Sequence, residues 1–364
     1  MEIMYSRWTA TSTTAEDELK AMINLFSYVL LQFSGDAEGA LELMRELQDE
    51  YGMMTTMSMD DFIEELKKQG LVKEDESGRL APTPKSERVM RTDALNEIFR
   101  SLKKSDVGNH DAPSNGSGVE RMPDTRDFAF GDQASNIDVT QTMTNLFKRT
   151  GDIEGINLQE DDIRVYETEH QTSCATVLMI DISHSMILYG EDRITPAKQV
   201  ALALAEMIQT RFPKDTLEVV LFGDEARRVT VRDIPYITVG PFHTNTRDGL
   251  RLSRQLLRRA RSGNKQIFMI TDGKPSALTE ESGRIYKNSW GLDPRIVNKT
   301  LDEAVACRRD GISIATFMVA QDQYLVQFVE DLTRSNQGRA FFTGLDGLGK
   351  NIFVDYVRNR RKHY

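Results

Sequence analysis

The chain has 364 residues, of which 46 are basic and 56 acidic, so its net charge is -10. A hydrophobic fraction of 39% and a charged fraction of 28% suffice for packed cores and exclude a disordered chain. The acidic balance disfavours binding to nucleic acid or to an anionic membrane, because both are negatively charged. We see no apolar run of membrane-spanning length and no secretory signal, and we therefore expect a cytoplasmic protein without a membrane segment.

The first hundred residues have helical periodicity. Apolar residues recur at helical spacing between Leu19 and Phe33, and further helices are predicted over 37–51 and 59–69. Gly70 ends the third helix, and the segments 71–73 and 79–81 flank a turn, which indicates a hairpin. A fourth helix is predicted from Pro84 to about residue 104.

This order of three helices, a hairpin and a helix resembles a winged helix. The segments that carry the resemblance are Gly70-Leu71-Val72 and Leu80-Ala81-Pro82-Thr83-Pro84-Lys85. Such a domain would bind DNA through its third helix, yet here that helix carries four acidic residues against two lysines, a net charge of -2. We therefore favour a contact with protein, and a DNA-binding regulator remains an alternative.

The composition changes between residues 105 and 136. The stretch 108–118 is rich in turn formers and poor in apolar residues, as is typical of a linker. We predict three parts: a helical domain over 1–105, a linker and connecting segment over 106–164, and an α/β domain over 165–364.

The last part alternates between strands and helices. Strands are predicted over 177–180, 217–222, 266–271, 312–318 and 339–343, and helices over 194–211, 296–310, 323–335 and 349–361. We expect Thr195 to cap the helix 194–211. The pattern predicts a doubly wound, mostly parallel sheet with ligands bound at the carboxyl ends of its strands.

Oxygen-bearing side chains gather where these strands end. Asp181, Ser183 and Ser185 follow the first strand, Asp272 follows the third, and Thr244 precedes a helix. Oxygen donors of this kind select a hard divalent cation, Mg²⁺ first and Mn²⁺ or Ca²⁺ next. Mg²⁺ retains water readily, so an open position would remain for an acidic side chain of another molecule.

These five residues resemble the metal-ion-dependent adhesion site (MIDAS) of the von Willebrand factor A (vWA) domain. The resemblance spans about residues 165–361, a Rossmann-like fold. It implies that the hydroxyls of Ser183, Ser185 and Thr244 bind the metal and that Asp181 and Asp272 act through water or in the outer shell. Phe242 and His243 stand where the family often has two glycines, which affects the rim of the site rather than its ligands.

The whole chain resembles uncharacterised bacterial vWA-domain proteins, on the segments 165–170 and 338–343. That resemblance implies a partnership with an AAA+ ATPase of the MoxR or magnesium-chelatase class. We expect a non-enzymatic adaptor that binds a partner carboxylate through Mg²⁺ and serves in client remodelling or metal insertion.

Two features leave alternatives open. A Mg²⁺-dependent phosphoester hydrolase would use the same metal residues, although no nucleophile or general base is visible. The segment 247–261 carries six arginines against Asp248, with Arg247, Arg251, Arg254 and Arg258 on one helical face. That face is either solvated or a dock for an acidic surface.

Overall fold

The computed structural model describes most of the chain, in two compact units. The described residues are 15–104, 120–129, 132, 137–151, 158–169, 173–190, 192–272, 274–288, 290–318, 323–342 and 348–360. One unit joins the N-terminal helical region to residues 174–357, and the other contains residues 120–173. The stretch 108–118, predicted as a linker, lies outside the described residues. Within them, no helix combines the length and apolar character needed to cross a bilayer.

The N-terminal region contains four helices and a hairpin, as the periodicity predicts. The helices are α1 (Ala15–Gln32), α2 (Ala37–Tyr51), α3 (Met59–Lys68) and α4 (Pro84–Lys104), and the hairpin strands are β1 (Val72–Glu74) and β2 (Leu80–Pro82). Ser58 and Asp61 form a capping box that begins α3. Phe26 of α1 meets Phe62 of α3 edge to face, with ring centroids 6.4 Å apart. The two rings fix α3 against α1 in the core of this region.

The α/β domain is built on a six-stranded sheet in the order β12-β11-β8-β5-β6-β7. The strands are β5 (Cys174–Asp181), β6 (Thr216–Phe222), β7 (Ala226–Val229), β8 (Asn264–Thr271), β11 (Ile312–Met318) and β12 (Arg339–Phe342). All neighbours pair in parallel except β7, which runs antiparallel to β6 at the edge. The predicted α/β fold class is confirmed.

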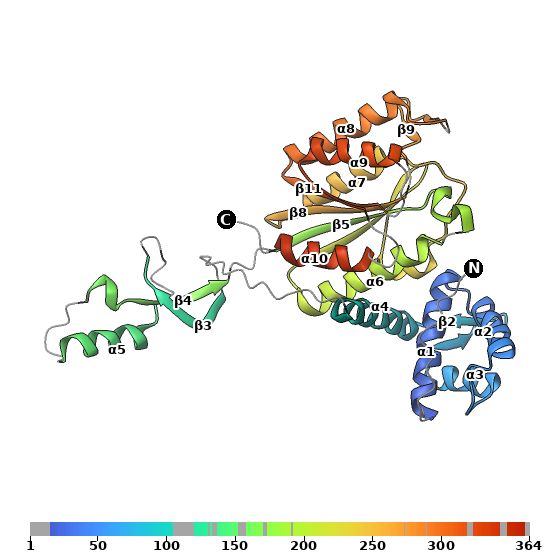
Figure 1. Cartoon of the computed structure of the whole chain (residues 1–364), viewed down its shortest axis with the longest axis horizontal. Helices are drawn as coiled ribbons and strands as arrows, with labels where there is room; N and C mark the ends of the chain where they lie inside the picture. Colours follow the sequence, from blue (N-terminus) through green and yellow to red (C-terminus); the bar gives the residue numbers. More distant parts are fainter. Residues whose placement is uncertain are drawn as a thin grey trace. The chain divides into compact units, whose positions relative to one another are not determined.

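Helices cover both faces of this sheet (Figure 1). They are α6 (Ile194–Arg211), α7 (Thr246–Arg259), α8 (Pro294–Arg309), α9 (Gln323–Asn336) and α10 (Leu348–Arg360). Successive side chains of β5 point to opposite faces of the sheet, so alternate residues pack into the apolar core on each face. Val177 and Met179 pack with α7, α8 and α9, whereas Leu178 and Ile180 pack with α6 and α10.

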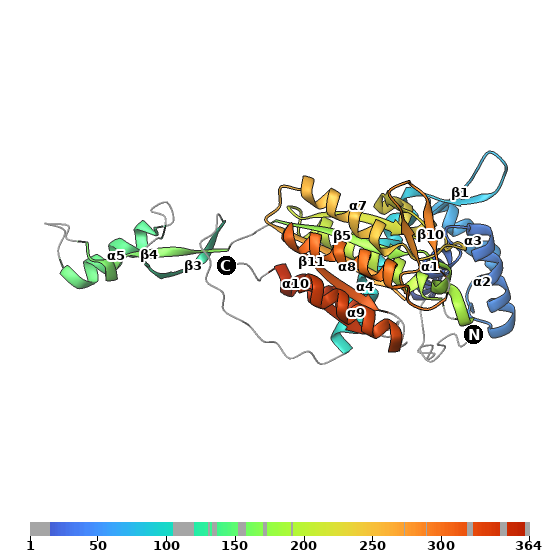
Figure 2. The same ribbon diagram turned by 90° about the horizontal axis from the view of Figure 1, so that it is seen from above.

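Three short strands and one helix start differ from the expectation. β7 and the hairpin of β9 (Ala277–Thr279) and β10 (Ile285–Lys287) were not predicted. The hairpin lies at the end of the sheet where β5 ends, in both views (Figures 1 and 2). Thr195 does not cap α6. Its backbone N–H instead donates to the Asp192 side chain at 3.0 Å, so Asp192 provides a hydrogen-bond acceptor for an N–H group in the first turn of the helix.

The helical region packs directly against α6 and the 3-10 helix η4 (Val231–Tyr236) through a buried lysine. Lys198 of α6 is fully buried, and its Nζ donates to Leu31 O at 3.1 Å, Ser34 Oγ at 3.0 Å and Pro235 O at 3.4 Å. Burial lowers the pKa of Lys198 to about 8, and the negative charge of Asp192 partly offsets this effect. The ammonium group thus joins three chain segments.

Further polar contacts support the same interface. Arg91 of α4 pairs with Glu206 of α6 at 3.3 Å, and Tyr236 donates its hydroxyl proton to Glu87 at 3.0 Å. One continuous apolar core, from Phe26 in α1 to Phe268 in β8, extends across the boundary. The helical region and the α/β domain therefore share a core.

The second unit contains two strands and a helix. β3 (Glu120–Asp127) pairs antiparallel with β4 (Arg164–Glu169), and α5 (Val139–Thr150) lies between them in sequence. Part of the predicted linker and connecting segment, 106–164, is therefore regular structure in the described residues. β4, predicted within the α/β domain, belongs to this unit.

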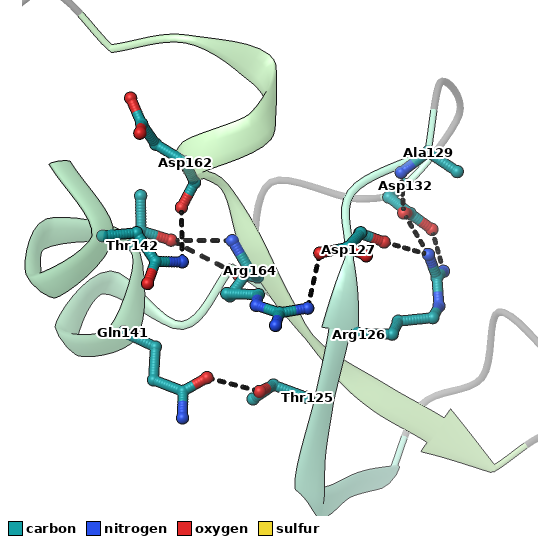
Figure 3. A network of polar contacts seen from close by, with 10 residues as sticks. Thr125, Arg126, Asp127, Ala129, Asp132, Gln141, Thr142, Asp162 and Arg164 are labelled. Carbon is teal, nitrogen blue, oxygen red and sulfur yellow. Dashed lines mark hydrogen bonds and ion pairs between the residues drawn. The ribbon is translucent and has the colours of Figure 1, made fainter. Parts of the chain in front are cut away.

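Ion pairs and hydrogen bonds dominate the second unit (Figure 3). Arg126 binds Asp132, Arg164 binds Asp127, and Arg149 holds Asp162 at 2.7 Å. Among its described residues, the buried apolar side chains are Leu146 and Val165. Polar contacts, rather than a large apolar core, define the arrangement of this unit.

Candidate metal centre

Two neighbouring strands bring the predicted carboxylates together. β5 and β8 pair in parallel with Ile180 opposite Ile270, so Asp181 and Asp272 leave the sheet at the same edge. The side chain of Thr271 donates to Asp181 Oδ2 at 2.6 Å and ties the two strand ends. Asp181 is fully buried and Asp272 is 2% exposed. Both carboxylates therefore lie in a region from which water is largely excluded.

The two serines of the first loop connect these strand ends. Ser183 Oγ and Ser185 Oγ are 3.0 Å apart, and Ser185 Oγ donates to Asp272 Oδ1 at 2.8 Å. Adjacent oxygens in an octahedral Mg²⁺ shell, with metal–oxygen distances of about 2.1 Å, lie about 3 Å apart. The two serine oxygens therefore already have the spacing that neighbouring ligands in such a shell require, while Asp272 lies within hydrogen-bond distance of Ser185. The residues present fit a hard cation.

Asp181 shapes the loop rather than reaching outward. Its Oδ1 accepts a hydrogen bond from the backbone of Ser183 at 2.9 Å, in addition to the Thr271 contact. Burial, together with the negative charge of Asp272, raises the pKa of Asp181 to about 7. A cation beside these carboxylates would oppose that shift, because positive charge favours their ionised forms.

Thr244 lies on the loop before α7, and this loop is fixed on two sides. Its backbone N–H donates to Ser276 Oγ at 3.0 Å, and its carbonyl accepts from Ser276 N at 2.9 Å. On the other side, His184 N donates to Phe242 O at 3.1 Å, which ties the threonine loop to the serine loop. Thr244 is 3% exposed, and its hydroxyl makes no hydrogen bond to any other described residue. That oxygen is available to a ligand.

Arg193 contacts the candidate site and was not predicted from the sequence. Its guanidinium, at the start of α6, forms an ion pair with Asp272 Oδ2, and its side chain is 13% exposed. The charges of the Asp181 and Asp272 carboxylates and the Arg193 guanidinium add up to -1. A bound divalent cation would therefore bring the net charge of the site to +1. No local motif marks Arg193, because only the fold brings it beside Asp272.

The donor set also limits the kind of metal. In the described part of the chain, no three His, Cys, Asp or Glu residues gather as metal ligands. A cation at this edge would therefore depend on the hydroxyls as well as on Asp181 and Asp272. His184 is exposed, and His243 approaches Asp224 with 3.5 Å between Nδ1 and Oδ1.

Several arginines of α7 already have ion-pair or hydrogen-bond partners within the chain. Arg254 contacts Glu303 at 2.6 Å and Asp310 at 3.1 Å, both from α8 or its end. Arg258 lies 3.7 Å from Asp310, and Arg247 donates to Thr279 O at 3.0 Å. The face therefore acts in part as a helix–helix contact, while Arg251 stays exposed.

Comparison with known families decides the classification of this domain. Residues 174–357 match the family model described as Rv0959-like protein, vWA domain, and residues 120–168 match Rv0959-like protein, third domain. The first match covers half of the chain. The chain belongs to the Rv0959-like family of vWA-domain proteins.

Two mycobacterial proteins are relatives of this chain. Uncharacterized protein Rv0959 of Mycobacterium tuberculosis and uncharacterized protein Mb0984 of Mycobacterium bovis are each 30% identical over 326 residues. The match covers 88% of this chain, which spans about half (48%) of the length of those relatives.

Solved structures with partial similarity to this chain include two vWA-type domains. The vWF domain of the type V pili tip protein Mfa5 from Porphyromonas gingivalis has a TM-score of 0.43 and 14% identity, covering 54% of this chain and 98% of that chain. The SpRpn10 VWA domain has a TM-score of 0.36 and 15% identity, and the match covers 49% of this chain and 94% of that chain.

Proposed function

We propose that the vWA domain of this Rv0959-like protein is a Mg²⁺-dependent protein-binding module. It would act as an adaptor that engages an acidic side chain of a partner. The observation that carries this proposal is the chain of oxygens from Ser183 through Ser185 to Asp272 at the carboxyl edge of the sheet, with separations of 3.0 and 2.8 Å. A vWA domain suggests protein interaction in general, and these contacts suggest where it occurs.

The chemistry of the donors favours Mg²⁺. Ser183, Ser185 and Thr244 would hold it through their hydroxyls, and Asp181 and Asp272 would act through water. Hard oxygen donors suit Mg²⁺, while Mn²⁺ and Ca²⁺ accept similar ligands. Bound there, the cation supplies an open coordination position for a carboxylate oxygen.

Arg193 strengthens the preference for an anionic partner. Because it neutralises Asp272, the protein's own groups compensate only one of the two positive charges of the cation. A carboxylate from the partner would neutralise the remaining charge. This arrangement supports a binding role in which the metal and the partner depend on each other.

The ATPase partner is the finer part of the proposal. Its support is the resemblance of the whole chain to bacterial vWA proteins paired with AAA+ ATPases. In that setting the domain would connect the ATPase to a client for remodelling or metal insertion.

A capture experiment tests the adaptor role. The full chain and its Asp181→Asn variant would be immobilised and exposed to lysate of the producing cells, each in Mg²⁺ and in EDTA. The substituted asparagine keeps an acceptor for Ser183 N while removing the charge, so the fold should persist. We expect one partner, an AAA+ ATPase, to bind only the wild type in Mg²⁺.

A matched control is Asp49→Asn, because Asp49 is an exposed carboxylate on α2, away from the acidic α3. This variant should capture the same partner as the wild type. Identical proteins on wild type and Asp181→Asn, with or without EDTA, would contradict the proposal. Capture of a Mg²⁺-dependent partner other than an ATPase would contradict only its finer part.

A further inference from the structure

Several large apolar side chains of the α/β domain are exposed, and some lie on segments that follow strands of its sheet. In the described part of residues 173–357 these exposed side chains are Ile187, Tyr236, Phe242, Trp290 and Phe342. Ile187 follows β5 and Phe342 ends β12, while the Phe242 ring packs over the glycine directly after β6. Tyr236 instead packs over Gly35 of the helical region. Isolated exposed apolar residues need no explanation, whereas a group around one site marks an interaction surface.

Trp290 is the most exposed of these side chains, and its backbone is held by hydrogen bonds. Its side chain is 89% exposed. The Asn288 side chain makes two hydrogen bonds to the Trp290 backbone: Trp290 N donates to Asn288 Oδ1 at 2.9 Å, and Asn288 Nδ2 donates to Trp290 O at 3.1 Å. Asn288 N donates in turn to Ser276 O at 2.8 Å, and Ser276 Oγ accepts from Thr244 N. A short series of hydrogen bonds therefore connects the indole's backbone to the proposed metal-binding threonine.

Phe242 is fixed on the other side of Thr244. A Cβ on Gly240 would lie 2.2 Å from the Phe242 ring and one on Gly223 would lie 2.9 Å from Phe242 Cβ, so the two glycines leave room for the packed ring. Its carbonyl accepts a hydrogen bond from His184 N at 3.1 Å, and His184 lies between Ser183 and Ser185 in the sequence. The ring is 38% exposed, and Ile187, two residues after Ser185, is 45% exposed. We call Ile187, Phe242 and Trp290 the apolar rim.

We propose that the apolar rim binds a partner segment in which one carboxylate is flanked by apolar side chains. Two features select this occupant. The candidate metal centre has a net charge of +1 once it contains a divalent cation, which attracts a carboxylate. The exposed apolar side chains on segments that are hydrogen-bonded to the loops of the site favour apolar neighbours, because removing both surfaces from water stabilises the complex. This proposal rests on the proposed function, whose metal site it extends.

Selection of peptides tests the specificity of the rim. The full chain, immobilised in Mg²⁺, would select from random linear peptides displayed on phage, in parallel with Trp290→Ala and Tyr51→Ala. Tyr51 is the matched control, since it is an aromatic residue 53% exposed on α2, in the helical region. Wild type and Tyr51→Ala should enrich acidic residues with apolar neighbours. Trp290→Ala should lose the apolar preference.

Fluorescence measures the contact directly. The chain has two tryptophans, Trp8 and Trp290, so Trp8→Phe leaves Trp290 as the only indole. The most enriched peptide, added in Mg²⁺, should shift its emission to shorter wavelength as the indole leaves water. We expect Trp290→Ala to bind this peptide at least tenfold more weakly, in the range of an aromatic hot spot.

The outcomes separate this proposal from the proposed function. Failure to enrich any peptide, or equal affinity for wild type and Trp290→Ala without an emission shift, would overturn the role of the rim. Peptides that shift the emission equally in Mg²⁺ and EDTA would support the rim as a docking surface and overturn the metal dependence. Loss of binding in both EDTA and Trp290→Ala would support both.

Discussion

At the scale of single residues, Arg193 sets the charge balance of the candidate metal centre. It pairs with Asp272 and so opposes the negative charge that would attract a cation. It also leaves the site with an excess positive charge once a divalent cation is present. Arg193 should therefore weaken metal binding and strengthen carboxylate binding.

We predict that Arg193→Gln binds Mg²⁺ roughly tenfold more tightly or better than the wild type, because two unit charges about 4 Å apart interact by about 4 kcal/mol near a protein surface. Calorimetric titration of the full chain measures this affinity. Arg193→Lys, which keeps the charge, is the matched control and should remain close to the wild type. Weaker or unchanged Mg²⁺ affinity in Arg193→Gln would contradict this charge argument.

Sequence reasoning reached the five candidate oxygen donors but not their environment. The spacing of Asp181, Ser183 and Ser185 after a strand is visible in the chain, and so is Asp272 after another strand. Arg193 is not, since its contact with Asp272 arises from the turn between the serine loop and α6. Trp290 has no local signal either, because exposure at a hairpin is a property of the fold.

At the scale of elements, α6 carries the boundary between the helical region and the α/β domain. Its Lys198 is buried with an ammonium group whose pKa is lowered to about 8. The unfolded chain would hold that proton up to a pKa near 10.4. Between these two values the unfolded state binds more protons, so the contribution of Lys198 to stability rises with pH.

We predict that the wild type gains stability relative to Lys198→Met as pH rises from about 8 to about 10, by up to about 3 kcal/mol. Urea unfolding of both proteins across that range gives the difference, and other titrating groups cancel in the comparison. The difference should be constant below pH 7, where Lys198 is protonated in both states. A constant difference across the whole range would show that the lysine is not desolvated.

Long elements were predictable and short edge elements were not. α6 and β11 have the predicted bounds, because twelve buried positions on α6 and the apolar run of β11 give strong local patterns. β7 has four residues, two of them exposed arginines, and each strand of the β9–β10 hairpin has three. Such segments become strands by pairing with a neighbour, which a local pattern does not encode.

At the scale of the whole molecule, the helical region and the vWA domain are continuous through one core, while residues 120–173 form a separate unit. The chain resembles its mycobacterial relatives over about half of their length. The acidic α3, with Asp60, Asp61 and Glu64 exposed, gives the helical region a surface better suited to protein than to DNA.

We propose that five side chains at the carboxyl edge of the sheet hold a divalent cation: Asp181, Ser183, Ser185, Thr244 and Asp272. Calorimetric titration of Mg²⁺ into the full chain, its Asp181→Asn variant and the Asp49→Asn control measures this binding. We predict one Mg²⁺ bound by the wild type and by Asp49→Asn, and none by Asp181→Asn, with Mn²⁺ giving the same pattern. Equal Mg²⁺ affinity in the wild type and Asp181→Asn, or no binding by the wild type, would show that these residues do not form a cation site.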